Sequence, residues 1–245
     1  CFTQGTVKTT YGTGCFMQMN TGDKIVESAS GLLPMVCWNI GGKTTYGLDG
    51  GIYISGAAVQ WLRDGLKIIS SAAETEAMAY AAGTNNGVYF VPAFAGLGAP
   101  YWDAYARGII TGLTRGTNKN HIIRATLDSI VYQVNDVLQA MEADSGIRLE
   151  ALKVDGGAAA NNYLMQTQAD IIGAPVQRPQ CVETTAMGAA MMAGRAVGVW
   201  NDRQLASLQS ADREFIPAMD ESTRMNLLKQ WNRAVGRSEN WIEQD

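Results

Sequence analysis

Two glycine turns in strand-like surroundings most constrain what this chain can fold into. The first spans residues 11–16, Tyr-Gly-Thr-Gly-Cys-Phe, and the second spans residues 153–157, Lys-Val-Asp-Gly-Gly. Glycines beside a threonine leave backbone N–H groups and one hydroxyl open to an anion. The second turn leads from a strand into a helix, where a nucleotide can lie against the backbone. Together the turns predict a nucleotide site, although a plain hairpin turn and a capped strand-to-helix connection would each explain one of them.

The hydrophobic pattern changes along the chain, and the change predicts the fold class. Alternating residues predict an antiparallel meander over residues 7–11, 15–19, 32–38 and 44–48. Later segments alternate between helices and strands. The expected helices are 55–69, part of 70–84, 120–141, 161–172, 184–197 and 220–241, and the expected strands are 87–92, 109–113, 149–154 and 175–178. This order predicts one α/β domain with a mixed sheet.

Composition excludes several classes of protein. The chain has 245 residues and a net charge of −4, without an arginine-rich stripe, so we expect no nucleic-acid partner. Its four cysteines and single histidine lack metal-ligand spacing, which predicts no metal site and reduced thiols in a cytoplasmic protein. The longest uncharged run, residues 77–102, is broken by glycines and prolines, so we expect no membrane span. The P-loop and dinucleotide-binding glycine motifs are absent.

Five ordered motifs resemble the C-terminal domain of the glycerol kinases, which are carbohydrate kinases of the actin–hexokinase–Hsp70 ATPase superfamily. The motifs lie at residues 10–22, 55–64, 91–102, 112–116 and 154–162. The resemblance runs from about residue 5 to the C-terminus, and five motifs in this order are far more specific than either turn alone. It implies a ribonuclease-H-like, actin-like ATPase domain with a mixed sheet flanked by helices.

The resemblance also implies roles for individual residues at an ATP site. On the family's pattern, Thr13 approaches the terminal phosphates and Gly56 lies beside them. Gln60 lies beside the nucleotide, and Gly157 lies against the ADP moiety. Asn161 hydrogen-bonds the base.

The reaction implied by the resemblance is transfer of the ATP γ-phosphoryl group to glycerol, with Mg²⁺ bridging phosphate oxygens. Phe16 is expected to pack on the carbon side of glycerol. In the family, the aspartate base lies just upstream of this region, and most polar glycerol contacts come from an N-terminal domain. We therefore assign no catalytic residue here, and we expect residues 1–245 to be a C-terminal ATP-binding domain. The chain opens on Cys1 rather than methionine, which suggests that its N-terminal partner domain has been left off.

Other functions stay open on the sequence alone. One is a kinase for a larger sugar, such as a pentulose or gluconate, although Phe16 favours glycerol. Another is a non-catalytic, actin-like nucleotide switch. A third is an interaction module that uses the helix expected at residues 220–241. The expected partners are glycerol, ATP or ADP and the N-terminal domain, and the pattern is compatible with a homo-oligomer.

Overall fold

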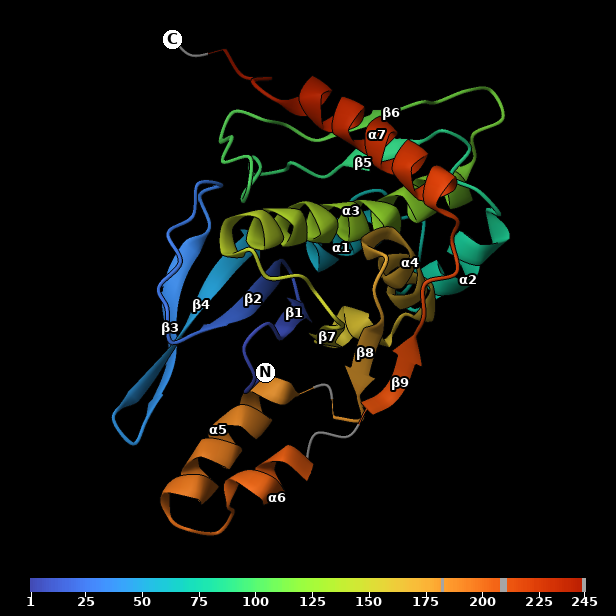
Figure 1. The fold of residues 1–245 in the computed structure, drawn as a ribbon. Coiled ribbons are helices and arrows are strands. Elements are labelled where there is room, and N and C mark those ends of the chain that lie inside the picture. Colours follow the sequence, from blue (N-terminus) through green and yellow to red (C-terminus); the bar gives the residue numbers. More distant parts are fainter. Residues whose placement is uncertain (182, 208–210, 244–245) are drawn as a thin grey trace.

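The computed structural model describes residues 1–181, 183–207 and 211–243. Its main feature is a seven-stranded sheet with the strand order β3-β4-β2-β1-β7-β8-β9 (Figure 1). These strands are β1 Val7–Tyr11, β2 Cys15–Gly22, β3 Leu33–Ile40, β4 Lys43–Ile52, β7 Leu152–Asp155, β8 Val176–Pro179 and β9 Ala211–Phe215. A separate two-stranded sheet consists of β5 Tyr89–Val91 and β6 Ile109–Thr111.

The main sheet is mixed, as predicted. Strands β3, β4, β2 and β1 form the expected antiparallel meander, whereas β1 pairs in parallel with β7 and β7 in parallel with β8. The β1–β7 pairing reaches Thr10 and Asp155, so both strands end at the same edge of the sheet. The two glycine turns follow these two strand ends. Crevices beyond the carboxyl ends of strands are the usual ligand sites of α/β sheets.

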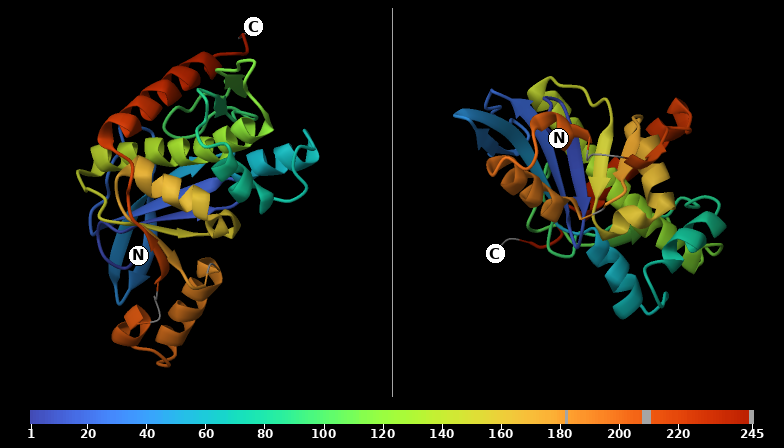
Figure 2. Two further views of the ribbon diagram at one scale, coloured as in Figure 1. Left: turned by 90° about the vertical axis from the view of Figure 1, so that its right-hand side faces the viewer. Right: turned by 90° about the horizontal axis from the view of Figure 1, so that it is seen from below.

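The helices divide between the two faces of the sheet. They are α1 Gly56–Asp64, α2 Glu74–Ala81, α3 Lys119–Ser145, α4 Asn162–Ile172, α5 Thr184–Ala196, α6 Asp202–Ser207 and α7 Glu221–Ser238, with a short 3-10 turn, η1, at Gly157–Ala160. Figures 1 and 2 show α3 lying across one face, with α7 and the small sheet outside it, while α5 and α6 lie on the opposite side. The N-terminus lies near α5, on the opposite side of the sheet from α7 (Figures 1 and 2).

Helix α3 is the central element of the core, and its predicted apolar stripe is confirmed. The buried residues of this stripe are Ile123, Leu127, Ile130, Val134, Val137 and Met141. The helix begins at a capping box, in which the Asn118 side chain accepts from the Asn120 amide and His121 Nδ1 accepts from the Asn118 amide. It ends at Gly146, which adopts a φ of +70°.

Several boundaries differ from the sequence prediction. Helix α1 ends at Asp64 rather than at residue 69, because the chain turns at Gly65 and Lys67 adopts a φ of +55°. Ile69 is nevertheless buried in the core. Its apolar side chain is therefore explained by burial and does not indicate a longer helix. Neither α6 nor β9 was predicted from the sequence. Within the described part of the chain, none of the helices combines the length and apolarity that a membrane crossing requires.

Candidate functional site

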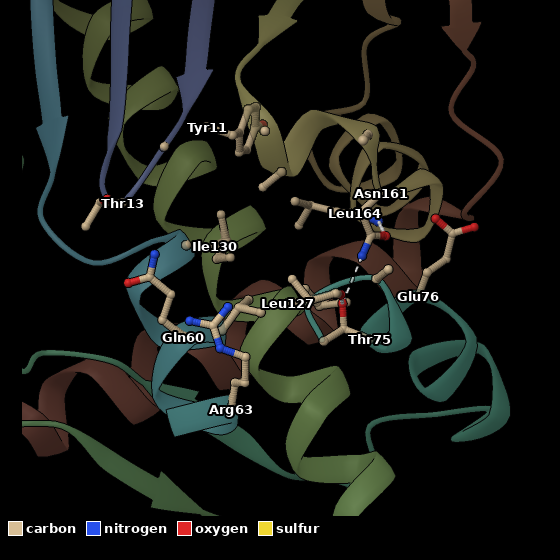
Figure 3. A pocket seen from close by; sticks show the side chains of 18 residues that line it. Tyr11, Thr13, Gln60, Arg63, Thr75, Glu76, Leu127, Ile130, Asn161 and Leu164 are labelled. Carbon is tan, nitrogen blue, oxygen red and sulfur yellow. Dashed lines mark hydrogen bonds between the residues drawn. The ribbon is translucent and has the colours of Figure 1, made fainter. Parts of the chain in front are cut away.

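A cavity of about 460 Å³ lies where β1 and β7 end (Figure 3). All five predicted nucleotide residues line it, although they come from three separate segments of the chain: Thr13, Gly56, Gln60, Gly157 and Asn161. The other lining residues are Tyr11, Gly12, Val59, Arg63, Ala72, Ala73, Thr75, Glu76, Leu127, Ile130, Ala158, Ala160 and Leu164. The two glycine turns therefore share one crevice.

The first glycine turn is held against the start of α1 by backbone hydrogen bonds. The amides of Ser55 and Ala57 donate to the Thr13 carbonyl at 2.9 and 3.0 Å, and the Gly56 amide donates to the Gly12 carbonyl at 3.0 Å. A Cβ on Gly56 would lie 2.6 Å from the Gly12 oxygen, so a side chain here would push the turn away from the helix. Gly56 thus fixes the shape of this wall through its close approach to the turn.

The paired glycines of the second turn have different reasons for lacking a side chain. Gly156 adopts a φ of +86°, and a Cβ there would lie 2.5 Å from the Tyr11 oxygen. Gly157 has no such conformation, and a Cβ there would meet nothing within 4 Å. The fold therefore requires a glycine at 156 but not at 157. What the missing side chain of Gly157 provides is open space in the cavity.

A buried tyrosine at the end of β1 connects the first turn to α4. The Tyr11 hydroxyl donates to Gln168 Oε1 of α4 at 2.8 Å, and Gln168 Nε2 donates to the Val131 carbonyl of α3 at 3.4 Å. Tyr11 and Gln168 are both fully buried. Burial raises the pKa of Tyr11 well above its ordinary value, so the phenol stays protonated and can donate. The end of β1 is thereby attached to α4, and α4 is attached to α3.

The opposite end of the cavity is built from side chains of α2 and α4. Asn161 caps α4, because its Oδ1 accepts from the Leu164 amide at 3.0 Å, and its Nδ2 donates to Thr75 Oγ1 at 3.2 Å. The Glu76 carboxylate accepts from the Asn162 backbone amide at 2.6 Å and from its side-chain Nδ2 at 3.1 Å. These contacts span 86 residues of sequence and attach the first turn of α2 to the first turn of α4.

Apolar residues from α3 form the middle of the cavity, between the two polar ends. Figure 3 shows Leu127 and Ile130 between Thr13 and Gln60 on one side and Asn161 on the other. This arrangement gives a cavity that is apolar in its centre and polar at its ends. It suits a ligand that combines a flat apolar body with a charged tail.

A buried carboxyl group on α3 follows Leu127, which lines the cavity. Asp128 accepts from the Tyr163 hydroxyl of α4 at 2.6 Å and lies 3.7 Å from Arg124 Nε. Burial raises the pKa of Asp128 to about 6, an effect that Tyr163 and Arg124 partly oppose. Arg124 also lies over the Tyr163 ring, 5.2 Å from its centroid. The cluster links α3 to α4.

The comparison with known families agrees with this geometry. A profile of the C-terminal domain of the FGGY family of carbohydrate kinases matches residues 7–197, which include every predicted site residue. The chain belongs to the FGGY family of carbohydrate kinases. The actin-like fold predicted from the resemblance to this family is confirmed.

Individual carbohydrate kinases resemble this chain to different degrees. Glycerol kinase from Carboxydothermus hydrogenoformans is 62% identical over 242 residues, which are 98% of this chain and 48% of that protein. The structure of Plasmodium falciparum glycerol kinase with ADP superposes with a TM-score of 0.91 and 37% identity, covering 99% of this chain and 48% of that one. Gluconate kinase from Lactobacillus acidophilus has a TM-score of 0.83 at 22% identity, over 96% of this chain and 47% of that one. The chain thus spans about half the length of the curated relatives it matches.

Sequence reasoning missed part of this carbohydrate kinase cavity and assigned one residue outside it. Arg63, Thr75 and Glu76 line the cavity but were not predicted; Arg63 lies within the 55–64 motif, whereas no motif covers Thr75 and Glu76. Arg63 follows Gln60 by three residues on α1, and that helical spacing was a usable signal. Phe16, the predicted glycerol contact, does not line the cavity; it lies at the start of β2 with its side chain 56% exposed.

Proposed function

We propose that the protein containing this chain transfers the γ-phosphoryl group of ATP to glycerol, forming glycerol 3-phosphate and ADP. The observation that carries this proposal is the convergence of Thr13, Gly56, Gln60, Gly157 and Asn161 on one cavity. Glycerol kinases at about 60% identity over nearly the whole chain support glycerol as the acceptor. On this proposal the chain is a C-terminal domain that supplies the nucleotide half of the active site.

The cavity suggests how ATP would lie. The hairpin end offers the Thr13 hydroxyl, which makes no hydrogen bond within the described residues, and it would receive the terminal phosphates. The open space at Gly157 would accept the ADP moiety in contact with the backbone. The apolar middle would hold the base and ribose, with Asn161 at the base edge. Such positioning accounts for most of the catalysis in phosphoryl transfer.

The groups that bind and activate glycerol would come mostly from outside this chain. We propose that an N-terminal domain brings the carboxylate that removes the glycerol hydroxyl proton, together with most polar glycerol contacts. The exposed Phe16 ring would then meet the carbon side of glycerol when the two domains close. Closure would exclude water and limit wasteful ATP hydrolysis.

Mg²⁺ is proposed as the partner of the nucleotide, but the described residues do not form a site for it by themselves. They contain no cluster of three or more histidine, cysteine or acidic side chains that could hold a metal ion. The carboxylate that lines the cavity belongs to Glu76, and its oxygens accept from Asn162. We therefore assign no Mg²⁺ ligand among the described residues.

Two rival functions differ from glycerol kinase in what the complete protein would do. A kinase for a larger sugar would prefer gluconate or a pentulose to glycerol; the similarity to gluconate kinase, at 22% identity, concerns the fold alone. A nucleotide switch would bind ATP without a small acceptor. The specific observation against both is the level of identity to glycerol kinases. Cytoplasmic localisation and homo-oligomerisation stay predictions.

The test is product formation by the purified full-length protein. With ATP and a panel of glycerol, gluconate and pentuloses, we expect glycerol 3-phosphate by mass spectrometry and ADP release that depends on glycerol. We expect no product from residues 1–245 alone, because the proton acceptor is missing. ADP release that ignores glycerol would favour the switch. If the isolated chain made glycerol 3-phosphate, the proposal that the proton acceptor lies outside residues 1–245 would be contradicted.

A further inference from the structure

We propose that Thr75 is a positioning residue that locks the Asn161 amide in one orientation and thereby makes the cavity prefer an adenine to a guanine base. The inference rests on the proposed function, since it takes the cavity to bind a nucleoside triphosphate. It concerns a residue that touches Asn161 from another helix and that no sequence motif marks. Thr75 is therefore assigned no direct part in the chemistry.

The Thr75 hydroxyl can only accept a hydrogen bond from Asn161. Thr75 lies in the first turn of α2 and is 1% exposed. Its Oγ1 donates to the Ala72 carbonyl at 2.6 Å. A hydroxyl carries one proton, so only its lone pairs remain for other partners. The group opposite it, 3.2 Å away, must then be the Asn161 NH₂ and not the amide oxygen.

The other end of the same amide is fixed by a donor. The Leu164 backbone N–H, which can only donate, meets Asn161 Oδ1 at 3.0 Å. Rotating the amide by half a turn would set NH₂ against this N–H and the amide oxygen against the Thr75 oxygen. Both contacts would become repulsive, so the two anchors select the same orientation. Figure 3 shows the locked amide at the edge of the cavity, with its bond to Thr75 dashed.

The locked amide retains one N–H and one oxygen lone pair for a ligand. An amide in this state complements adenine, whose 6-amino group donates next to ring nitrogens that accept. In guanine an acceptor, O6, replaces the 6-amino donor, and at N1 a donor replaces the acceptor. A freely rotating amide could serve either base by turning over, whereas a locked amide favours adenine. Thr75 therefore strengthens, together with the Leu164 amide, the one orientation that favours adenine.

The experiment compares kcat/KM for ATP and GTP in the full-length protein, with glycerol as acceptor. Thr75→Val removes the acceptor while keeping the side-chain shape, and we expect the ATP-to-GTP ratio to fall by about fivefold, the effect of one neutral hydrogen bond. Thr75→Ser restores the acceptor and should restore the ratio. Thr126→Val is the matched control, because Thr126 is also buried but donates within α3, to the Ile122 carbonyl at 2.9 Å.

The ratio separates positioning from general damage, since a purely structural loss lowers the rate with both nucleotides equally. A Thr75→Val ratio equal to that of the wild type would overturn the inference. If the valine variant does not fold, Thr75→Ala removes the same acceptor without placing a methyl group against the Asn161 amide. The ATP-to-GTP ratio of kcat/KM is then compared in the same way. If the wild type phosphorylates glycerol but the ratio does not move, only the role of Thr75 fails. If the wild type phosphorylates glycerol with neither nucleotide, the proposed function fails.

Discussion

The two ends of the cavity are built in different ways. The end proposed to bind the phosphates (the phosphate end), at Gly12, Thr13 and Gly56, is made of backbone that approaches backbone, because turn carbonyls accept from the first amides of α1. The end proposed to hold the base (the base end), between α2 and α4, is made of side chains that hydrogen-bond across 86 residues of sequence. Close backbone contact leaves no room for adjustment, whereas side-chain contacts can be weakened one at a time. Changes at the phosphate end should therefore have large effects, and changes at the base end should have graded ones.

The largest effect is expected at Thr13. Thr13→Ala in the full-length protein should lower kcat by about 10²–10³, the loss seen when one preorganised donor to a developing negative charge is removed. Thr13→Ser keeps the hydroxyl and should retain most of the activity. Steady-state kinetics with ATP and glycerol measure both. An unchanged kcat in the alanine variant would remove Thr13 from the mechanism.

The next effect separates the two adjacent glycines. Gly156→Ala should lower the free energy of unfolding by about 2–3 kcal/mol, because it combines a left-handed conformation with a Cβ placed 2.5 Å from the Tyr11 oxygen. Gly157→Ala should leave stability within ~0.5 kcal/mol, because its Cβ meets nothing, yet weaken ADP binding by about tenfold. Urea unfolding and calorimetric titration with ADP measure the two quantities.

Gly116 provides the control for the pair. Its φ is not left-handed, and a Cβ there would meet its nearest neighbour, Thr114 Oγ1, at 3.8 Å. It lies outside the cavity, so Gly116→Ala should change neither stability nor ADP binding. Equal loss of stability at 156 and 157 would show that both glycines serve the fold. That result would leave Gly157 without its proposed contact to the nucleotide.

The pH dependence of stability should reveal the buried carboxyl of Asp128. Burial raises the pKa of Asp128 from 3.8 to about 6, so its contribution is fully present below pH 4 and is lost as the pH rises through 6. Between pH 4 and pH 7.5, the wild type should lose on the order of 2–3 kcal/mol of unfolding free energy relative to Asp128→Asn. Urea unfolding across this range measures the difference.

A second buried carboxyl sharpens this test. Burial also raises the pKa of Asp136 to about 6, but this residue accepts from Trp231 and Tyr101 beneath α7, away from the cavity. Asp136→Asn should show a similar pH-dependent stability difference without a change in ADP affinity. Asp128→Asn should alter both, because Asp128 holds Tyr163 of α4. If the stability difference between the wild type and either variant did not change with pH, the raised pKa of that residue would be contradicted.

The smallest effect is expected at Glu76. Glu76→Ala removes the acceptor of the Asn162 backbone amide, which should cost about 1 kcal/mol and raise KM for ATP by about fivefold while kcat stays unchanged. Glu74→Ala is the matched control in the same turn of α2, since the Glu74 carboxylate accepts from Ser70 and Ser71, which lie just before this helix. If Glu76→Ala lowered kcat as much as Thr13→Ala does, the expected difference between the two ends of the cavity would be contradicted.

The two ends also differ in how far the sequence predicted them. The hairpin at residues 11–16 and the turn at 155–157 were predicted because glycine placement is a local signal. The order of the meander and the stripe along α3 were predicted by hydrophobic period. Thr75 and Glu76 were missed because their partners, Asn161 and Asn162, lie 86 residues away, and no local spacing encodes such a contact.

The misplaced elements have a related cause. Ile69 extended the predicted helix by five residues because it is buried, although the chain has already turned at Gly65. Strand β9 is short, and its pairing with β8 depends on a partner some thirty residues earlier. Periodicity reports which side chains are buried, whereas the ends of an element depend on contacts elsewhere in the fold.

A crystal structure of the full-length protein with ADP would show whether the two glycine turns bind one nucleotide. We expect the ADP phosphates to lie within about 3.2 Å of the Thr13 hydroxyl, a hydrogen-bond distance, and the nucleotide to touch the Gly157 backbone. ADP bound in another crevice, with the space between Thr13 and Gly157 left open, would contradict this expectation.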